Sequence, residues 1–240
     1  MKKINIARED TIKPNIYQVF FDENSKSKLS KYFISYENTN PINQKEFEYG
    51  VMRHLYRQND WENSTHLSVL SWKFEEKTKG NPEKLQKYLT KKPVYDIYIV
   101  NPYEGYYRIP FIYSKFDNMW DHGEYFHPGM KKIASELFDI AGLDPKILNK
   151  SHPKDLICYC NYWIANRKFW DLYMSYSERL YSAVYKSPDS FKEKLFFYDA
   201  DVSYDRGGFF AYIFERLFTS ILVEFYQSFK IKNIKLRSLR

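Results

Sequence analysis

The sequence predicts an α/β protein built on a mostly parallel, Rossmann-like sheet with flanking helices and a more helical second half. Short β-rich apolar runs alternate with helical segments over residues 15–100, which is the order that builds a parallel sheet. Hydrophobic residues make up 44% of the chain and aromatic residues 20%, so disorder is excluded. The chain has 240 residues, enough to bury a sizeable core.

Three segments of the first half have the pattern of strands. Residues 15–21 form an apolar run that follows Pro14, and residues 94–100 alternate and stop at Asn101-Pro102. Residues 66–72 form another apolar run. Because helical segments separate them, these strands are expected to lie parallel in one sheet.

Two helices are expected between these strands. Residues 45–58 place apolar side chains at near-helical spacing. Residues 81–90 begin with Asn81 and Pro82, an N-cap followed by a proline in the first turn. The second half is expected to contain helices over residues 128–141, 167–185, 189–197 and 207–229, a strand over 158–165 and a short last strand over 231–236.

The two cysteines, Cys158 and Cys160, lie two positions apart and are too close to staple distant parts of a fold. We expect them to be reduced thiols. The first residues carry charge without a following apolar stretch, and no window approaches the ~20 apolar residues of a membrane helix. These features predict a cytoplasmic protein and leave peripheral attachment at the inner face of a membrane open.

The formal net charge of +7 favours partners that carry phosphate, although scattered lysines are also typical of a lysine-rich proteome. The end of the chain differs, because its basic residues occur without an acidic one. They are Lys230, Lys232, Lys235, Arg237 and Arg240. We expect this end either to touch a membrane surface or to form a solvated tail. No nucleic acid partner is expected, because the basic residues do not gather with aromatic ones on a recognisable module.

In an α/β sheet, ligands bind beyond the carboxyl ends of the strands. The strand over 66–72 ends in Ser71, Trp72 and Lys73, and the segment runs on to Lys77. A lysine here suits a diphosphate, and a tryptophan suits a base or a sugar. The strand over 94–100 leads to Asn101 and Tyr103. The alternative for both segments is a simple strand end with solvated side chains.

Residues 120–129 (WDHGEYFHPG) combine two of the five histidines with two carboxylates and two flexible turn residues. Imidazole and carboxylate groups activate hydroxyls or bind divalent ions. We expect a loop here, which either lines an active site or is a polar turn. Its candidate functional side chains are Trp120, Asp121, Glu124 and His127.

Two charged features lie later in the chain. Asp199 and Asp201 have the Asp-x-Asp form that holds Mn²⁺ or Mg²⁺ against a diphosphate, or they are solvated loop carboxylates. Glu215 lies inside an otherwise apolar helix, where its charge must be paired with Arg216 or Arg206. Such a pair is either a structural ion pair or the floor of a site.

Four segments, in this order, resemble bacterial glycosyltransferase-like domains of capsule and lipopolysaccharide loci, which have a GT-A-like fold. They are the strand Ile16–Phe20, the unit from Glu48-Tyr49-Gly50 to Leu67–Phe74, the segment Tyr159–Trp170 (YCNYWIANRKFW), and the helix from Arg206-Gly207-Gly208-Phe209 to Glu215-Arg216-Leu217-Phe218. The chain departs from the family pattern at Tyr95–Pro102, which lacks the usual Asp-x-Asp motif. A role for Mn or Mg is therefore left open, and no metal ligands are assigned.

The resemblance implies a glycosyltransferase that moves a sugar from a nucleotide-sugar donor to a surface-polysaccharide or lipid-linked acceptor. Within a single domain, 1–240, residues 1–110 would bind the donor and the more helical residues 111–240 the acceptor. The implied donor-binding residues are Tyr17, Gln18, Ser71, Trp72, Lys73, Asn101 and Tyr103. The sugar or acceptor side would comprise Trp120, Asn161, Arg206 and Glu215, and the acceptor's proton would pass to His127, Glu124 or Asp121. The alternative is a non-catalytic binding or scaffold protein that retains the fold.

Overall fold

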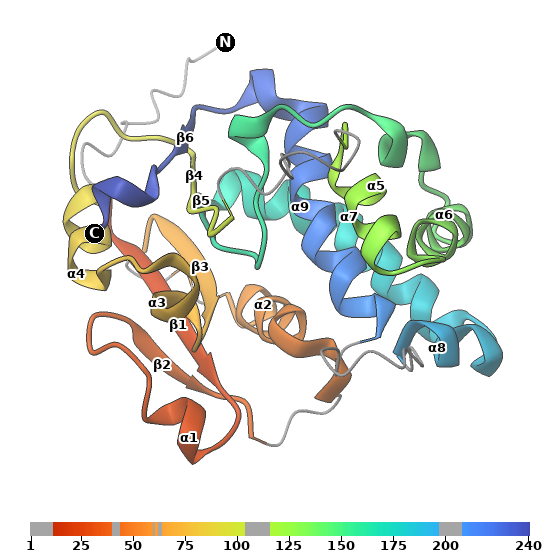
Figure 1. Ribbon diagram of the computed structural model, residues 1–240, viewed down its shortest axis with the longest axis horizontal. Helices are drawn as coiled ribbons and strands as arrows, with labels where there is room; N and C mark the ends of the chain where they lie inside the picture. Colours follow the sequence, from red (N-terminus) through yellow and green to blue (C-terminus); the bar gives the residue numbers. More distant parts are fainter. Residues whose placement is uncertain (1–11, 40–43, 60, 62–63, 104–115, 197–207) are drawn as a thin grey trace, which may run out of the picture.

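A six-stranded sheet forms the centre of the protein, with the spatial order β2-β1-β3-β5-β4-β6 (Figure 1). The computed structural model describes residues 12–39, 44–59, 61, 64–103, 116–196 and 208–240. The strands are β1 Pro14–Phe20, β2 Ile34–Glu37, β3 His66–Ser71, β4 Ile97–Ile99, β5 Trp163–Asn166 and β6 Ile231–Asn233. The strands predicted over 15–21, 66–72 and 94–100 are therefore confirmed, the last of them in a shorter form.

Every strand except β5 runs in the same direction. β1 pairs in parallel with β2 and β3, and β4 pairs in parallel with β6. β5 lies between β3 and β4 and is antiparallel to both. This mostly parallel sheet with flanking helices is the predicted fold class, and it is consistent with a GT-A-like α/β fold.

The described helices carry most of the chain outside the sheet. They are α1 Glu23–Lys26, α2 Phe47–Arg57, α3 Phe74–Thr78, α4 Pro82–Leu89, α5 Met119–Phe126, α6 Met130–Ile140, α7 Arg167–Lys186, α8 Asp189–Phe196 and α9 Phe209–Phe225. Short 3₁₀ turns occur at Gln44–Glu46, Pro145–Asn149, Lys154–Leu156, Tyr226–Ser228 and Leu236–Ser238. The predicted helices are confirmed within the described residues, with small shifts at their ends. None of these helices has both the length and the apolar character to cross a membrane.

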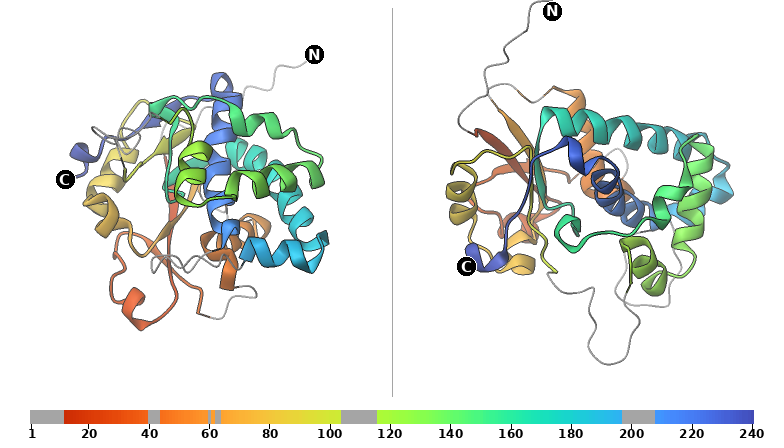
Figure 2. Two further views of the ribbon diagram at one scale, coloured as in Figure 1. Left: turned by 45° about the vertical axis from the view of Figure 1, so that its right-hand side comes forward. Right: turned by 90° about the horizontal axis from the view of Figure 1, so that it is seen from above.

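Alternation of side chains along the strands builds two separate cores. In β4, Ile97 and Ile99 face one side and Tyr98 the other, and in β5 Trp163 and Ile164 separate in the same way. The larger core packs the sheet against α2, α6, α7 and α9, and the smaller one packs it against α3, α4 and the end of the chain. Seen from above in Figure 2, α5 and α6 (green) lie on the far side of α9 (blue) from the sheet.

Two strands differ from the sequence prediction. β5 begins at Trp163 and not at Cys158, because Cys160 and Asn161 have positive φ angles of 63° and 55°, which an extended strand excludes. β2 was not predicted, because it is a four-residue edge strand with mostly exposed side chains and so lacks an apolar signal.

The segment predicted as a loop over residues 120–129 is mostly helical, since α5 covers Met119–Phe126. Asn118 caps the helix, because its side-chain oxygen accepts hydrogen bonds from the N–H groups of Trp120 and Asp121, both at 2.8 Å. Trp120 has no exposed surface and anchors the helix in the core. The loop prediction was wrong because it rested on the polar composition of the segment, whereas the cap and the buried tryptophan stabilise a helix.

The basic end of the chain is folded onto the protein. It does not form the solvated tail that was one of the two alternatives expected from the sequence. Leu239 is fully buried, and its carbonyl oxygen accepts a hydrogen bond from the Asn81 N–H at 2.7 Å. Lys235 Nζ lies 3.1 Å from a carboxylate oxygen of Asp155. The last residues thereby close the smaller core.

Asn166 supports both β5 and α7, and its loss should be measurable. Its Oδ1 accepts a hydrogen bond from the Phe169 N–H (3.2 Å), and its Nδ2 donates one to Asp96 Oδ1 (2.7 Å). We expect Asn166→Ala to lower the free energy of unfolding by about 1–2 kcal/mol, since a cap and a further hydrogen bond are removed. Urea denaturation measures this, with the exposed Ser182→Ala in α7 as control. Equal stability of Asn166→Ala and the wild type would contradict the expectation.

Candidate functional site

A cavity of about 300 Å³ lies where the carboxyl end of β3 meets the amino end of β5. The two ends meet because β5 runs against its neighbours, which brings Cys160 and Asn161 beside Ser71. Ligand sites of α/β sheets are expected at this edge. The lining residues are Glu46, Phe47, Glu48, Tyr49, Ser71, Lys73, Lys77, Cys160, Asn161, Ala211, Tyr212 and Glu215.

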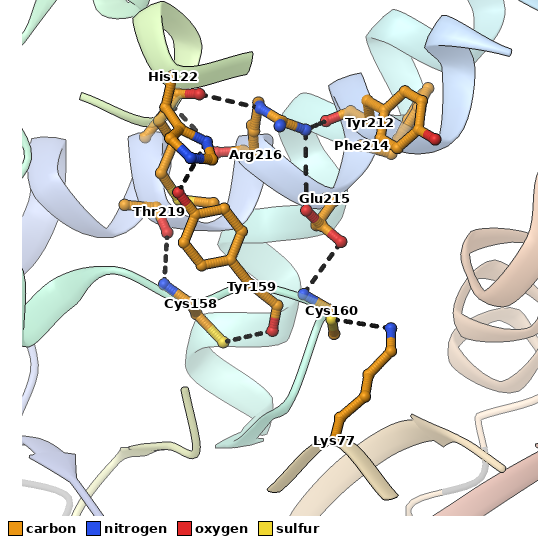
Figure 3. A network of polar contacts seen from close by, with 12 residues as sticks. Lys77, His122, Cys158, Tyr159, Cys160, Tyr212, Phe214, Glu215, Arg216 and Thr219 are labelled. Carbon is orange, nitrogen blue, oxygen red and sulfur yellow. Dashed lines mark hydrogen bonds and ion pairs between the residues drawn. The ribbon is translucent and has the colours of Figure 1, made fainter. Parts of the chain in front are cut away.

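Lys77 is a partly buried cation in the wall of this cavity. Its Nζ donates a hydrogen bond to Cys160 Sγ at 3.1 Å (Figure 3). Burial alone would lower the pKa of Lys77, but Cys160, Tyr103 and Glu215 raise it well above its usual value. Burial raises the pKa of the Cys160 thiol to about 12, so Cys160 is neutral at pH 7. Lys77 is therefore charged at neutral pH, and its positive charge is balanced by the carboxylates of Glu215 and Glu48.

Glu215 connects the cavity to a buried arginine. Its Oε2 accepts a hydrogen bond from the Cys160 N–H at 3.0 Å, and its Oε1 lies 3.7 Å from Arg216 Nη1. Arg216 donates hydrogen bonds to the carbonyl oxygens of Met119 and Tyr212, both at 3.0 Å (Figure 3). The predicted pairing of Glu215 with Arg216 is confirmed. Arg216 ties α5 to α9 while Glu215 lines the cavity.

Cys160 and Asn161 reach the cavity through a strained turn. Both have left-handed φ angles, which cost energy for residues other than glycine and concentrate at functional sites. Asn161 is 8% exposed, and its Oδ1 is buried without a hydrogen-bond partner among the described residues. An unsatisfied buried acceptor costs about 1–3 kcal/mol. This oxygen is therefore a candidate contact for a ligand.

Two glutamates from the start of α2 form another wall. Glu46 accepts hydrogen bonds from the hydroxyl groups of Tyr181 (2.9 Å) and Tyr185. Within the described part of the chain, the Glu48 side chain makes no hydrogen bond or ion pair with another residue. Burial raises the pKa of Glu48, and the nearby Glu215 carboxylate adds to this, while the ammonium group of Lys77 opposes it. Glu48 is thus a carboxylate with unused acceptor capacity.

A second, larger cavity of about 660 Å³ shares Glu46 and Phe47 with the first. It lies between α2 and the segment at the end of β2. Arg53 and Arg57 line it, and both pair with Glu178, at 2.6 Å and 2.7 Å. The full lining comprises Tyr36, Glu37, Asn38, Thr39, Glu46, Phe47, Gly50, Val51, Arg53, His54, Arg57, Gln58 and Tyr181.

The predicted donor residues are only partly brought together. Ser71 and Lys73 line the first cavity. Gln18 is fully buried, and its Oε1 accepts a hydrogen bond from the Ser30 N–H at 2.8 Å, which ties β1 to the segment that leads to β2. Tyr17 packs edge-on against Tyr36, with ring centroids 6.1 Å apart. Gln18 and Tyr17 are absent from the cavity lining formed by the described residues.

Three further donor candidates also lie outside that lining. The Trp72 ring is covered by Lys28 Nζ at 4.4 Å and by Lys73 Nζ at 4.9 Å. Asn101 Oδ1 accepts a hydrogen bond from the Tyr103 N–H at 3.1 Å, as expected where a strand stops. Tyr103 is nevertheless close enough to contribute to the raised pKa of Lys77.

The candidates on α5 make structural contacts. Trp120 Nε1 donates a hydrogen bond to Ser220 Oγ at 2.8 Å. Asp121 pairs with Lys131 Nζ at 2.6 Å. The two carboxylate oxygens of Glu124 accept hydrogen bonds from the N–H groups of Gly129 and Lys131, both at 2.7 Å, and so bind the start of α6.

His127 is the α5-side candidate nearest to the cavity. Its ring stacks on that of Tyr212, which lines the cavity, with centroids 4.1 Å apart. Burial and the Arg216 charge lower the pKa of His127 to about 4. The imidazole is therefore neutral at pH 7.

The remaining candidates fall outside the described residues: Arg206, and Asp199 and Asp201 of the Asp-x-Asp motif. Within the described part of the chain, no group of three or more His, Cys, Asp or Glu side chains is placed to hold a metal ion. Asn161 and Glu215, both predicted on the sugar side, do line the first cavity.

Glu48, Cys160 and Tyr212 line the cavity but were not assigned roles from the sequence. Glu48 lies in the first turn of a predicted helix, where acidic residues are common for electrostatic reasons alone. Tyr212 is one of many aromatic residues in an apolar helix. Cys160 lies inside the predicted strand over 158–165, so no local pattern marked it as a site residue.

Comparisons with known proteins add little to this geometry. No family model matches the chain, and no curated protein matches its sequence. Among solved structures, the chain is similar to the apo structure of WbbM, a bifunctional glycosyltransferase, with 13% sequence identity and a TM-score of 0.47. The match covers 92% of this chain and 44% of the WbbM chain. We base the function on the cavity, because a likeness at this level defines neither substrate nor activity.

The buried histidines predict a specific loss of stability in acid. Burial lowers the pKa of His152 from 6.5 to about 4, so the unfolded chain binds a proton that the folded protein excludes between these values. The stabilisation is complete above pH 6.5 and is lost as the pH falls toward 4, with a slope of up to about 1.4 kcal/mol per pH unit from this residue.

His152→Asn should reduce that slope, because asparagine retains an acceptor for the Met119 N–H, which now bonds His152 Nδ1 at 3.2 Å, and does not titrate. Urea titrations between pH 4.5 and 7.5 measure it. The slope is separate from any uniform loss of stability in the variant. An unchanged slope would show that His152 is not responsible.

Proposed function

We propose that this chain is a glycosyltransferase that takes the diphosphate of a nucleotide-sugar donor into the first cavity. The observation that carries the proposal is the placement of Lys73 and the partly buried Lys77 in an open cavity at the carboxyl edge of a mostly parallel sheet. Cations at this edge suit a phosphate-bearing ligand. The volume of about 300 Å³ is at the lower end of the range for small-molecule sites.

The diphosphate would replace Cys160 as the partner of Lys77. A neutral thiol is a weak acceptor for an ammonium group, and phosphate oxygens form much stronger charge-assisted hydrogen bonds. Lys73 Nζ now lies over the Trp72 ring at 4.9 Å, and it would turn toward the same phosphates. Ser71 would remain bound to the Tyr162 hydroxyl (2.7 Å) as the floor of the site.

The nucleoside would extend toward the second cavity, which shares the lining residues Glu46 and Phe47 with the first. That cavity contains the aromatic rings of Tyr36 and Tyr181 and several planar polar groups, which suit stacking and hydrogen bonding to a base and ribose. A glycan or lipid-linked acceptor would approach from the α9 side, where Tyr212 and His127 stack.

Removing Lys77 tests diphosphate binding. A thermal-shift screen with UDP, GDP, CDP and ADP should find at least one that raises the Tm. For that diphosphate, Lys77→Met should weaken binding by roughly 10-fold or more in calorimetry, because a charge-assisted contact is lost. Lys132→Met, on the exposed face of α6, is the matched control and should bind like the wild type. If none of the four binds, or if Lys77→Met binds as tightly, the proposal fails.

Turnover separates an enzyme from a binding protein that retains the fold. We propose His127 as the group that takes the acceptor's proton, because its ring stacks on Tyr212 of the cavity wall. Asp121 and Glu124 instead bind Lys131 and the start of α6. His127→Ala should lower sugar-nucleotide turnover by about 10²-fold or more, the usual effect of losing a general base, and leave diphosphate binding unchanged. Glu124→Ala provides the comparison. Equal turnover in His127→Ala and the wild type would remove His127 from this role.

A further inference from the structure

The lysines of the first cavity and its amide and carboxylate side chains come from different elements, although the charges of Lys73 and Lys77 reach Glu48. Lys73 and Lys77 come from the segment that follows β3. Glu48, Glu215 and Asn161 come from α2, α9 and the turn before β5, and we call them the oxygen wall. Lys77 Nζ contacts Cys160 Sγ and Glu215 Oε2 contacts the Cys160 N–H, so the two kinds of group meet at a single residue (Figure 3).

The oxygen wall has acceptor capacity that the described residues leave unused. Asn161 Oδ1 is buried without a hydrogen-bond partner among them, and the Glu48 side chain makes no hydrogen bond or ion pair with another of these residues. Glu215 uses one oxygen for the Cys160 N–H and faces Arg216 with the other at 3.7 Å, beyond hydrogen-bond distance. A ligand that satisfies this wall must donate hydrogen bonds.

We propose that the oxygen wall binds a neutral, hydroxyl-rich sugar and excludes sugars that carry a carboxylate. The proposal rests on the proposed function, because a diphosphate held by Lys73 and Lys77 leaves the attached sugar beside this wall. Sugar hydroxyls donate to carboxylate and carbonyl oxygens, whereas the carboxylate of a uronic acid is an acceptor and repels Glu48 and Glu215. The wall therefore acts as a specificity filter for the donor.

Two features make the filter effective. The charge of Glu215 reaches Glu48, so once the diphosphate engages Lys73 and Lys77 a third carboxylate beside these two meets like-charge repulsion. The left-handed turn at Cys160 and Asn161 holds the Asn161 side chain in the wall. A sugar that leaves these acceptors unpaired loses more binding than one that merely lacks an apolar contact.

Matched donors test the filter by calorimetry. UDP-glucose and UDP-glucuronic acid differ only at C6, as do GDP-mannose and GDP-mannuronic acid. For the pair whose free diphosphate binds, we expect the hexose donor to bind the wild type at least about 10-fold more tightly than the uronic acid donor. Glu48→Gln should reduce this preference to within about 3-fold, since one negative charge is removed. The exposed Glu76→Gln on α3 is the control and should preserve the preference.

A second variant, Asn161→Gly, separates loss of the sugar contact from a general loss of folding. Asn161→Gly keeps a residue that tolerates the left-handed backbone and removes the amide. It should weaken binding of the hexose donor by about 10-fold and leave binding of the free diphosphate unchanged, because only the sugar contact is lost. If the uronic acid donor binds the wild type as tightly as the hexose donor, the filter is wrong while the proposed function stands. If none of UDP, GDP, CDP and ADP binds, the filter and the proposed function are both wrong.

Discussion

The candidate site depends on the reversed strand β5, which brings Cys160 and Asn161 to the carboxyl end of β3. This strand pairs with β3 and β4 in the opposite direction to both, so its amino end emerges at the edge where the other strands finish. Trp163 fixes the strand, because its ring is buried and stacks on Phe218 of α9 with centroids 4.9 Å apart. Asn166 fixes the other end through the α7 cap and Asp96. A parallel strand in this position would carry its leading residues, Cys160 and Asn161, to the opposite edge of the sheet.

The site holds polar groups at some cost to stability. Two successive residues have left-handed backbones, one buried amide oxygen lacks a partner in the described structure, and Glu48 is a desolvated carboxylate with a raised pKa. Each feature is unfavourable for folding alone, and a large aromatic core offsets them. Strain and an unpaired acceptor in one cavity are the features on which the proposed binding role rests.

Sequence patterns were sufficient for the elements with strong local signals. The capped helix at Asn81-Pro82, the capped helix at Asn166 and the apolar strand β3 all match their predictions. The loop prediction over 120–129 was wrong because burial of Trp120 decides that segment, and burial is a tertiary property. β2 escaped detection because an exposed edge strand has no apolar run. Ser71, Lys73, Asn161 and Glu215 were assigned to the site and do line the cavity.

The rest of the site depends on contacts that are remote in sequence. Glu48 and Glu215 are brought into one cavity by the packing of α2 against α9, which no spacing within either helix reveals. The direction of β5 could not be predicted either, because an apolar strand has the same sequence pattern in parallel and antiparallel pairing.

The central claim is that the lysine side of the first cavity holds a diphosphate. The most direct measurement is a crystal structure grown with whichever of UDP, GDP, CDP and ADP binds most tightly. The account predicts phosphate oxygens within about 3 Å of Lys77 Nζ, with Lys77 withdrawn from Cys160. A diphosphate bound elsewhere on the protein, with Lys77 still on the Cys160 thiol, would contradict it.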